Sequence, residues 1–173
     1  GTVAANLTGF PVLVRLESLA SEFWTEAKSD GGDVRVTDAL GNPLPFDLVR
    51  FDPMTQTGVL FFLADLLAAG DNEFYVTAGD ALLNLLPATD TYGRNAVWGG
   101  FEVVYLFDGD LIDRSGKHDL TVQAGTPTYA AASLGVAGGL NVTANLQLIA
   151  DTLSSATSFT LAASGTFANT SAN

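Results

Sequence analysis

Short apolar runs separated by turn-forming residues dominate the first half of the chain. Residues 33–37 alternate apolar and polar side chains, as a strand with one buried face does. The apolar run 58–64 predicts a strand buried on both faces, and residues 17–28 are compatible with a helix. Further strands are expected at residues 11–16, 44–51 and 72–77. These elements recur at the spacing typical of a β-sandwich.

Turn residues divide the remaining pattern. Residues 38–43 predict a reversal that pairs 33–37 with 44–51 in a β-hairpin with a longer loop. The leucine-rich residues 81–87 are interpreted either as a helical turn or as an apolar clasp to the next unit. We therefore expect a β module at 1–86, a linker at 87–96 and a second β module at 97–173. Its β segments are expected at residues 97–98, 101–107, 120–122, 140–142, 146–149 and 158–162.

Composition narrows the class of protein. The 173 residues include 19 acids, 7 bases and no cysteine, and hydrophobic residues make up 47%. Many apolar residues and few charges argue against charge-driven disorder, and disulfides and zinc–thiolate sites are excluded. A net charge of -12 also argues against binding to nucleic acid or to an anionic membrane, because both need clustered Lys and Arg. The most apolar stretch, 59–67, is too short to span a bilayer, which needs about 20 residues.

The charge is unevenly distributed. Residues 1–96 hold 13 acids and 5 bases, whereas Asp151 is the only charged residue from Leu120 to Asn173. Of those last 54 residues, 36 are Ala, Gly, Ser, Thr or Asn. Such a surface lacks the charges that keep strand edges from pairing. One interpretation is a tail packed within an assembly; the others are a Ser/Thr-rich β-domain and a flexible linker. Because the chain opens Gly1-Thr2-Val3, we expect a processed product or a segment of a longer polypeptide.

Several motifs in the first half occur in a characteristic order. They read FPVLVRL at 10–16, DVRVTD at 33–38, LPFDL at 44–48, GVLFF at 58–62 and NEFYVTAG at 72–79. Over residues 3–80 the chain resembles the bacterial and phage family called domain of unknown function 2341. WGGFEVVYL at 98–106, DRSGKHDLT at 113–121 and SFTL at 158–161 are similar to parts of a concanavalin A-like (laminin G-like) jelly roll, although too few residues remain for a full one.

The resemblance implies an all-β fold and a place in a phage particle or on a bacterial surface. It implies a jelly-roll-like β-sandwich followed by a partial or reduced concanavalin A-like module, as in phage tail or capsid appendages and bacterial surface proteins. We expect a non-enzymatic phage virion protein, such as a tail fibre, head fibre or decoration component. Its partners would be other virion subunits, copies of itself in a homo-oligomer such as a trimer, and host-surface glycans. The alternative is a glycan-binding module of a bacterial secreted or cell-surface protein.

Catalytic patterns are weak in this sequence. Concanavalin-like glucanases place Glu-x-Asp-x-Glu on one strand face, and this triplet does not occur. A glycan hydrolase would have to use Glu102 and Asp110. Ser115, His118 and Asp119 are the residue types of a hydrolytic triad, but nearness in sequence does not place them around one imidazole. We therefore expect no enzyme activity.

Two kinds of binding site are candidates. Asp108, Asp110 and Asp113 offer oxygen ligands of the kind that calcium prefers, or else they stabilise a turn. Aromatic rings that could stack on sugars are Trp24, Tyr92 and Tyr129. For Trp24, which lies in an amphipathic segment with Phe23, a cap over the sheet is the favoured interpretation, whereas Trp98 and Tyr105 are expected in the core.

Overall fold

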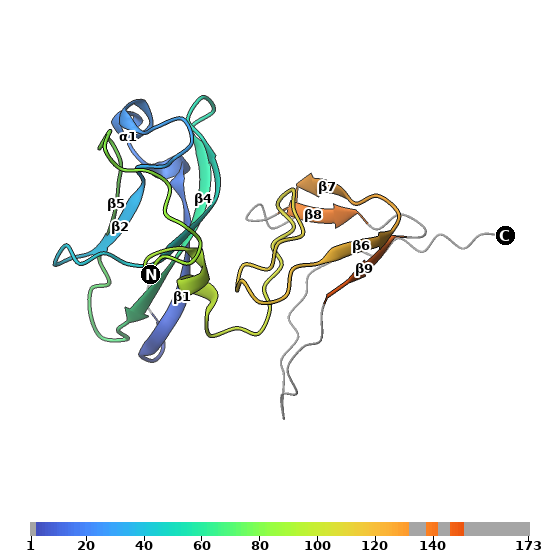
Figure 1. Ribbon diagram of the computed structural model, residues 1–173. Helices are drawn as coiled ribbons and strands as arrows, with labels where there is room; N and C mark the ends of the chain where they lie inside the picture. Colours follow the sequence, from blue (N-terminus) through green and yellow to red (C-terminus); the bar gives the residue numbers. More distant parts are fainter. Residues whose placement is uncertain (1–2, 132–137, 142–145, 151–173) are drawn as a thin grey trace.

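The computed structural model describes residues 3–131, 138–141 and 146–150 of the chain. In these residues the fold is mostly β, with antiparallel sheets and a few short helices, so the expected β class is confirmed. Figure 1 shows the five N-terminal strands in one body and strands β6–β9 beside it. The helices found in the described residues are not long and apolar enough to cross a membrane.

A three-stranded antiparallel sheet forms the larger layer of the first body. Its order is β1 (Leu7–Arg15), β4 (Thr57–Leu66) and β3 (Phe46–Asp52). The central strand β4 contributes Val59, Leu60 and Phe62 to the buried residues. Residues 59–64 of β4 are apolar without alternation because the core covers one face of the strand and α2 (Arg94–Trp98) contacts the other.

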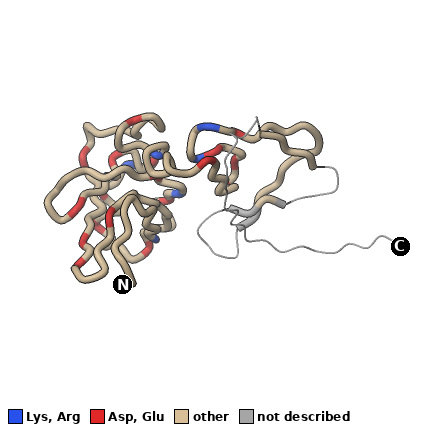
Figure 2. The backbone as a smooth tube through the Cα atoms, turned by 90° about the horizontal axis from the view of Figure 1, so that it is seen from below, with Lys and Arg blue, Asp and Glu red and all other residues tan. Residues whose placement is uncertain are grey.

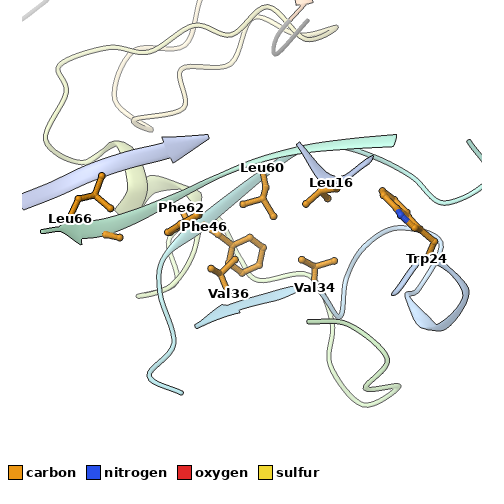
Figure 3. Packing of buried hydrophobic residues seen from close by; sticks show 9 residues of the cluster. Leu16, Trp24, Val34, Val36, Phe46, Leu60, Phe62 and Leu66 are labelled. Atoms are coloured by element: carbon orange, nitrogen blue, oxygen red, sulfur yellow. The ribbon is translucent and has the colours of Figure 1, made fainter. Parts of the chain in front are cut away.

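The second layer pairs β2 (Arg35–Asp38) with β5 (Phe74–Thr77). Val34 and Val36 face Phe46 and Leu60 of the larger sheet across the core, as Figure 3 shows. Side chains alternate between the two faces of a strand, so the period-two pattern at 33–37 is accounted for by this one buried face.

The predicted hairpin is wrong in its pairing. The chain does reverse at residues 38–43, where Asp38 N donates to Asn42 O and Leu44 N to Val36 O. Beyond Leu44, however, the chain crosses to the other layer, so β3 pairs with β4 and β2 pairs with β5. Pro43 and Pro45 flank the crossing and have no N–H to continue a ladder with β2.

The helix expected at residues 17–28 forms in two short pieces, η1 (Leu16–Ser18) and α1 (Ser21–Glu26). The buried Asp33 holds the chain that follows α1, because its carboxylate accepts hydrogen bonds from Lys28 N at 2.9 Å and Gly79 N at 2.7 Å. Burial raises the pKa of this carboxyl, but its backbone hydrogen bonds outweigh burial and lower the pKa overall.

Strand β1 is interrupted near its start. Its register with β4 shifts between Leu7 and Phe10, and Gly9 has a φ of 58°, a conformation that favours glycine. Gly9 N donates to the carboxylate of Asp65 at 2.8 Å. The N–H of Gly9 is thus already hydrogen-bonded to a side chain and is not free to pair with another strand.

The second half differs from the expected strand pattern at its start. Residues 97–98 belong to helix α2 (Arg94–Trp98), and residues 101–107 form no strand apart from an isolated bridge between Tyr105 and Asp113. Residues 81–87 contain a turn and no helix.

The two sheets of the second half carry no charged residue in their described strands. β6 (Thr121–Ala124) pairs with β9 (Gln147–Ile149), and β7 (Thr128–Ala131) pairs with β8 (Gly138–Asn141). The strands expected at 120–122, 140–142 and 146–149 overlap β6, β8 and β9, and the one at 158–162 lies outside the described residues. Figure 2 shows the charges concentrated in the first body and in the loop that follows it.

Candidate functional site

A buried carboxylate on β3 joins the first body to the loop that follows α2. Phe46 faces the core, and the adjacent Asp47 faces the opposite side of the sheet, where α2 packs. Trp98 Nε1 donates to Asp47 Oδ2 at 2.8 Å, and Arg114 Nη1 lies 3.7 Å from Asp47 Oδ1. Burial raises the pKa of Asp47, and the Trp98 hydrogen bond and the Arg114 charge oppose this shift.

Two more ion pairs hold the same loop. Arg114 Nη2 lies 3.0 Å from Asp110 Oδ2, so the buried Arg114 bridges Asp47 and Asp110. Arg50, also on β3, pairs with Asp108. Two of the three aspartates expected to bind calcium are therefore neutralised by arginines.

Asp113 organises the loop from within. Its side chain is fully buried and accepts hydrogen bonds from the backbone N–H groups of Val104, Ser115, Lys117 and His118 and from the Ser115 hydroxyl. Burial raises the pKa of Asp113, but the Ser115 hydroxyl and these backbone donors outweigh burial and lower the pKa overall. The ionised carboxylate thus acts as a fixed acceptor around which residues 104–118 fold.

Ser115, His118 and Asp119, the residue types of a hydrolytic triad, lie in this loop, where Ser115 and Asp119 form hydrogen bonds within the loop itself. The Ser115 hydroxyl donates to the Glu102 carbonyl at 3.1 Å as well as to Asp113. Asp119 accepts a hydrogen bond from Asp113 N at 2.8 Å, and His118 Nε2 lies 3.3 Å from Glu102 Oε1. The two carboxylates of the hydrolase alternative, Glu102 and Asp110, are therefore each paired with a basic residue.

The calcium candidates are not assembled into a cation site. Asp108, Asp110 and Asp113 each have separate partners within the protein. Within residues 3–131, 138–141 and 146–150, no group of three or more His, Cys, Asp or Glu side chains could hold a metal ion. The turn interpretation of this Asp-rich loop agrees with the hydrogen bonds that it makes.

The three candidate sugar-stacking rings lie on different elements. Trp24, on α1, is 3% exposed, and its ring stacks on Phe51 with centroids 5.2 Å apart, so neither face is open to a sugar. This differs from its expected role in glycan binding and agrees with the capping interpretation. Tyr92 is 37% exposed in the loop before α2, and Tyr129 is half-buried on β7.

The rings expected in the core differ in burial. Trp98 is buried and packs edge-on against Phe61, with centroids 4.9 Å apart. Tyr105 is half-buried and stacks on Phe107, with centroids 5.8 Å apart. Trp98 thus contributes both apolar contact and a hydrogen bond to the junction at Asp47.

A cavity of about 280 Å³ lies beside this junction. Asp47 and Arg114 line it, together with Arg35 from β2 and Arg94 from the start of α2. The sequence pattern did not mark these four residues as a site. Asp47 alone offered a signal, as an acid between the apolar Phe46 and Leu48, whereas nothing in the sequence links the three arginines.

Comparison of the chain with protein-family models, curated proteins and solved structures finds no match. The resemblance to the domain of unknown function 2341 family therefore stays a prediction. Function has to be inferred from the chain's own residues and their contacts.

Proposed function

We propose that the protein is a non-enzymatic structural module of a phage particle that acts through contacts with neighbouring subunits. The observation that carries this proposal is the edge strand β1, which exposes Phe10 (44%) and Leu13 (40%) to solvent. The order of motifs that resembles the domain of unknown function 2341 family supports the phage setting. In this proposal the first body is a reduced β-sandwich, and residues 97–173 are a reduced concanavalin A-like module.

An open strand edge favours association. Strand β1 lies at one end of its sheet, and no described strand pairs with its outer edge. Unpaired N–H and C=O groups along such an edge can add a strand from another chain. Exposed apolar side chains beside the edge add the hydrophobic contact that a stable interface requires. A homo-oligomer, for which a trimer is our expectation, would cover this edge.

The oligomeric state in solution tests the proposal. Analytical ultracentrifugation of the purified chain should show an oligomer, and Leu13→Asp should shift it to monomer by placing a charge in the interface. The matched control is Leu40→Asp, because Leu40 is 88% exposed in the turn after β2 and is not part of the β1 edge. Circular dichroism should show that both variants keep their strands. A wild-type chain that stays monomeric at high concentration contradicts the proposal.

Labelling tests the virion assignment separately. Gold-labelled antibody against the chain should bind purified phage particles. Labelling of bacterial cell surfaces in place of particles would favour the glycan-binding alternative. The feature that supports this alternative is Tyr92, whose exposed ring directly precedes the cavity-lining residues Gly93 and Arg94.

A further inference from the structure

The cavity beside Asp47 has cationic walls in an acidic protein. Three guanidinium side chains line it, Arg35, Arg94 and Arg114, and Asp47 is the only acid among its lining residues. The chain as a whole carries a net charge of -12. Nearly half of its seven basic residues thus converge on one cavity, which is opposite in sign to the rest of the molecule.

Two of these arginines, Arg35 and Arg94, form no ion pair within 4 Å in the described part of the chain, although the charge of Arg94 acts on Asp47. Arg35 donates to the backbone carbonyls of Gly32 at 2.9 Å, Val34 at 2.6 Å and Asn84 at 2.8 Å, and these contacts fix its position. Arg94 forms none of the ion pairs found among the described residues. Asp110, which pairs with Arg114, is a second carboxylate beside Asp47, so the three cations exceed the two acids by one positive charge.

Unused hydrogen-bond donors lie at the same place. The Nε groups of Arg94 and Arg114 are buried and have no hydrogen-bond partner. Arg114 is only 6% exposed, although its terminal nitrogens pair with Asp47 and Asp110. A buried donor without an acceptor is costly and rare in folded proteins. Both Nε atoms are closed off from solvent, so a ligand acceptor would reach them, and remove this cost, once the two side chains shift toward the cavity.

We propose that the cavity binds the carboxylate of a small organic anion. Guanidinium groups present planar pairs of N–H donors that match the two oxygens of a carboxylate. Phe46, Leu48 and Leu85 line the same cavity and provide contact for the carbon body of such a ligand. Its volume of about 280 Å³ is close to the lower limit of ordinary ligand pockets, so it fits one sugar acid or a comparable acid.

The carboxylate could belong to a free acid or to a terminal uronic acid of a glycan. Both sources present the same group to the arginines, and the site is defined by that group. This inference is independent of subunit assembly, because none of the cavity residues named here lies on β1.

Nuclear magnetic resonance of the full ¹⁵N-labelled chain tests the proposal. Titration with glucuronate should shift the Nε–Hε signals of Arg94 and Arg114 saturably, and glucose at the same concentration should not shift them. Arg94→Gln should weaken binding by about tenfold or more, since it removes a donor and a charge. Arg15→Gln is the matched control, because it makes the same change on β1, outside the cavity, and should bind as the wild type does.

Fold integrity and specificity are measured in parallel. Circular dichroism should show that Arg94→Gln keeps the wild-type strands, and its melting temperature should fall slightly, because the charge of Arg94 favours the ionised form of the buried Asp47. An oligosaccharide ending in glucuronate that binds more tightly than glucuronate itself would assign a glycan source, and equal affinity would assign a free acid. The proposal is overturned if glucuronate produces no saturable shift, if glucose binds equally well, or if phosphate binds more tightly than any carboxylate. It is likewise overturned if Arg94→Gln binds as well as Arg15→Gln.

Discussion

Replacing Asp113 by alanine should release the loop that joins the two halves of the chain. The carboxylate is fully buried and accepts five hydrogen bonds, four from backbone N–H groups and one from the Ser115 hydroxyl. Alanine offers none of these acceptors. The donors would then be left buried, or the loop would have to open so that water can reach them.

The size of the effect follows from the donors that cannot reach water easily. A buried donor that loses its acceptor costs about 1–3 kcal/mol. Lys117 is exposed, so we count the backbone donors of Val104, Ser115 and His118, which at about 1 kcal/mol each give roughly 3 kcal/mol after partial relaxation. This corresponds to an increase of about 100-fold in the equilibrium for opening the loop. Asp113→Asn should cost less, because its amide keeps one oxygen acceptor.

Hydrogen–deuterium exchange of peptides from residues 101–119 measures this opening directly. The control is Asp119→Ala in the same loop, because Asp119 is exposed and accepts a single backbone hydrogen bond, from Asp113. Its loss should cost about 1 kcal/mol. If exchange in Asp113→Ala were no faster than in Asp119→Ala, the carboxylate would not be the group that holds the loop.

Three further predictions concern stability. Trp24→Ala should lower the free energy of unfolding in urea by about 3–5 kcal/mol, since it empties a core position, whereas Leu40→Ala should change it by less than about 0.5 kcal/mol. Gly93→Ala should destabilise by at least about 1–3 kcal/mol in the same assay, because a Cβ there would lie 2.3 Å from a backbone carbonyl oxygen; Gly100→Ala, which meets open space, should be neutral. The folded-state pKa of Asp113 lies below its ordinary value of 3.8, so its stabilisation is present above that pH and lost as the pH falls below it. Urea midpoints at pH 5 and pH 3 should therefore differ less in Asp113→Asn than in the wild type, and equal differences would contradict this account.

Hydrophobic periodicity predicted the strands of the first body better than their pairing. The run at 58–64 and the alternation at 33–37 correspond to β4 and β2, because burial dictates residue type locally. β2 pairs with β5 and not with β3, and this pairing depends on long-range packing that no local sequence pattern encodes. The apolar pair Val97-Trp98 suits a strand and a short helix equally, and its contacts with the first sheet decide in favour of helix α2.

The candidate site was harder to predict for a related reason. The Asp-rich loop stands out in the sequence, but its partners are backbone groups and two arginines, Arg50 far away along the chain and Arg114 close by. Asp47 and Arg114 are separated by 67 residues, and their pairing depends on α2 and the loop folding back over β3. The cavity arginines carry no spacing that marks a site, so only the folded chain brings them together.

The bulge at Gly9 limits what can be built on the β1 edge. Pro11 has no N–H to donate, so a neighbouring strand that extended this sheet could follow a regular ladder only along residues 12–15, about 14 Å of chain. At Gly9 the backbone N–H already donates to the Asp65 side chain. The bulge there also bends β1, so a neighbouring strand could not stay in register beyond it. A strand added at this edge would therefore pair with only a short segment of each subunit, so side-chain contacts would have to supply most of the stability of such an interface.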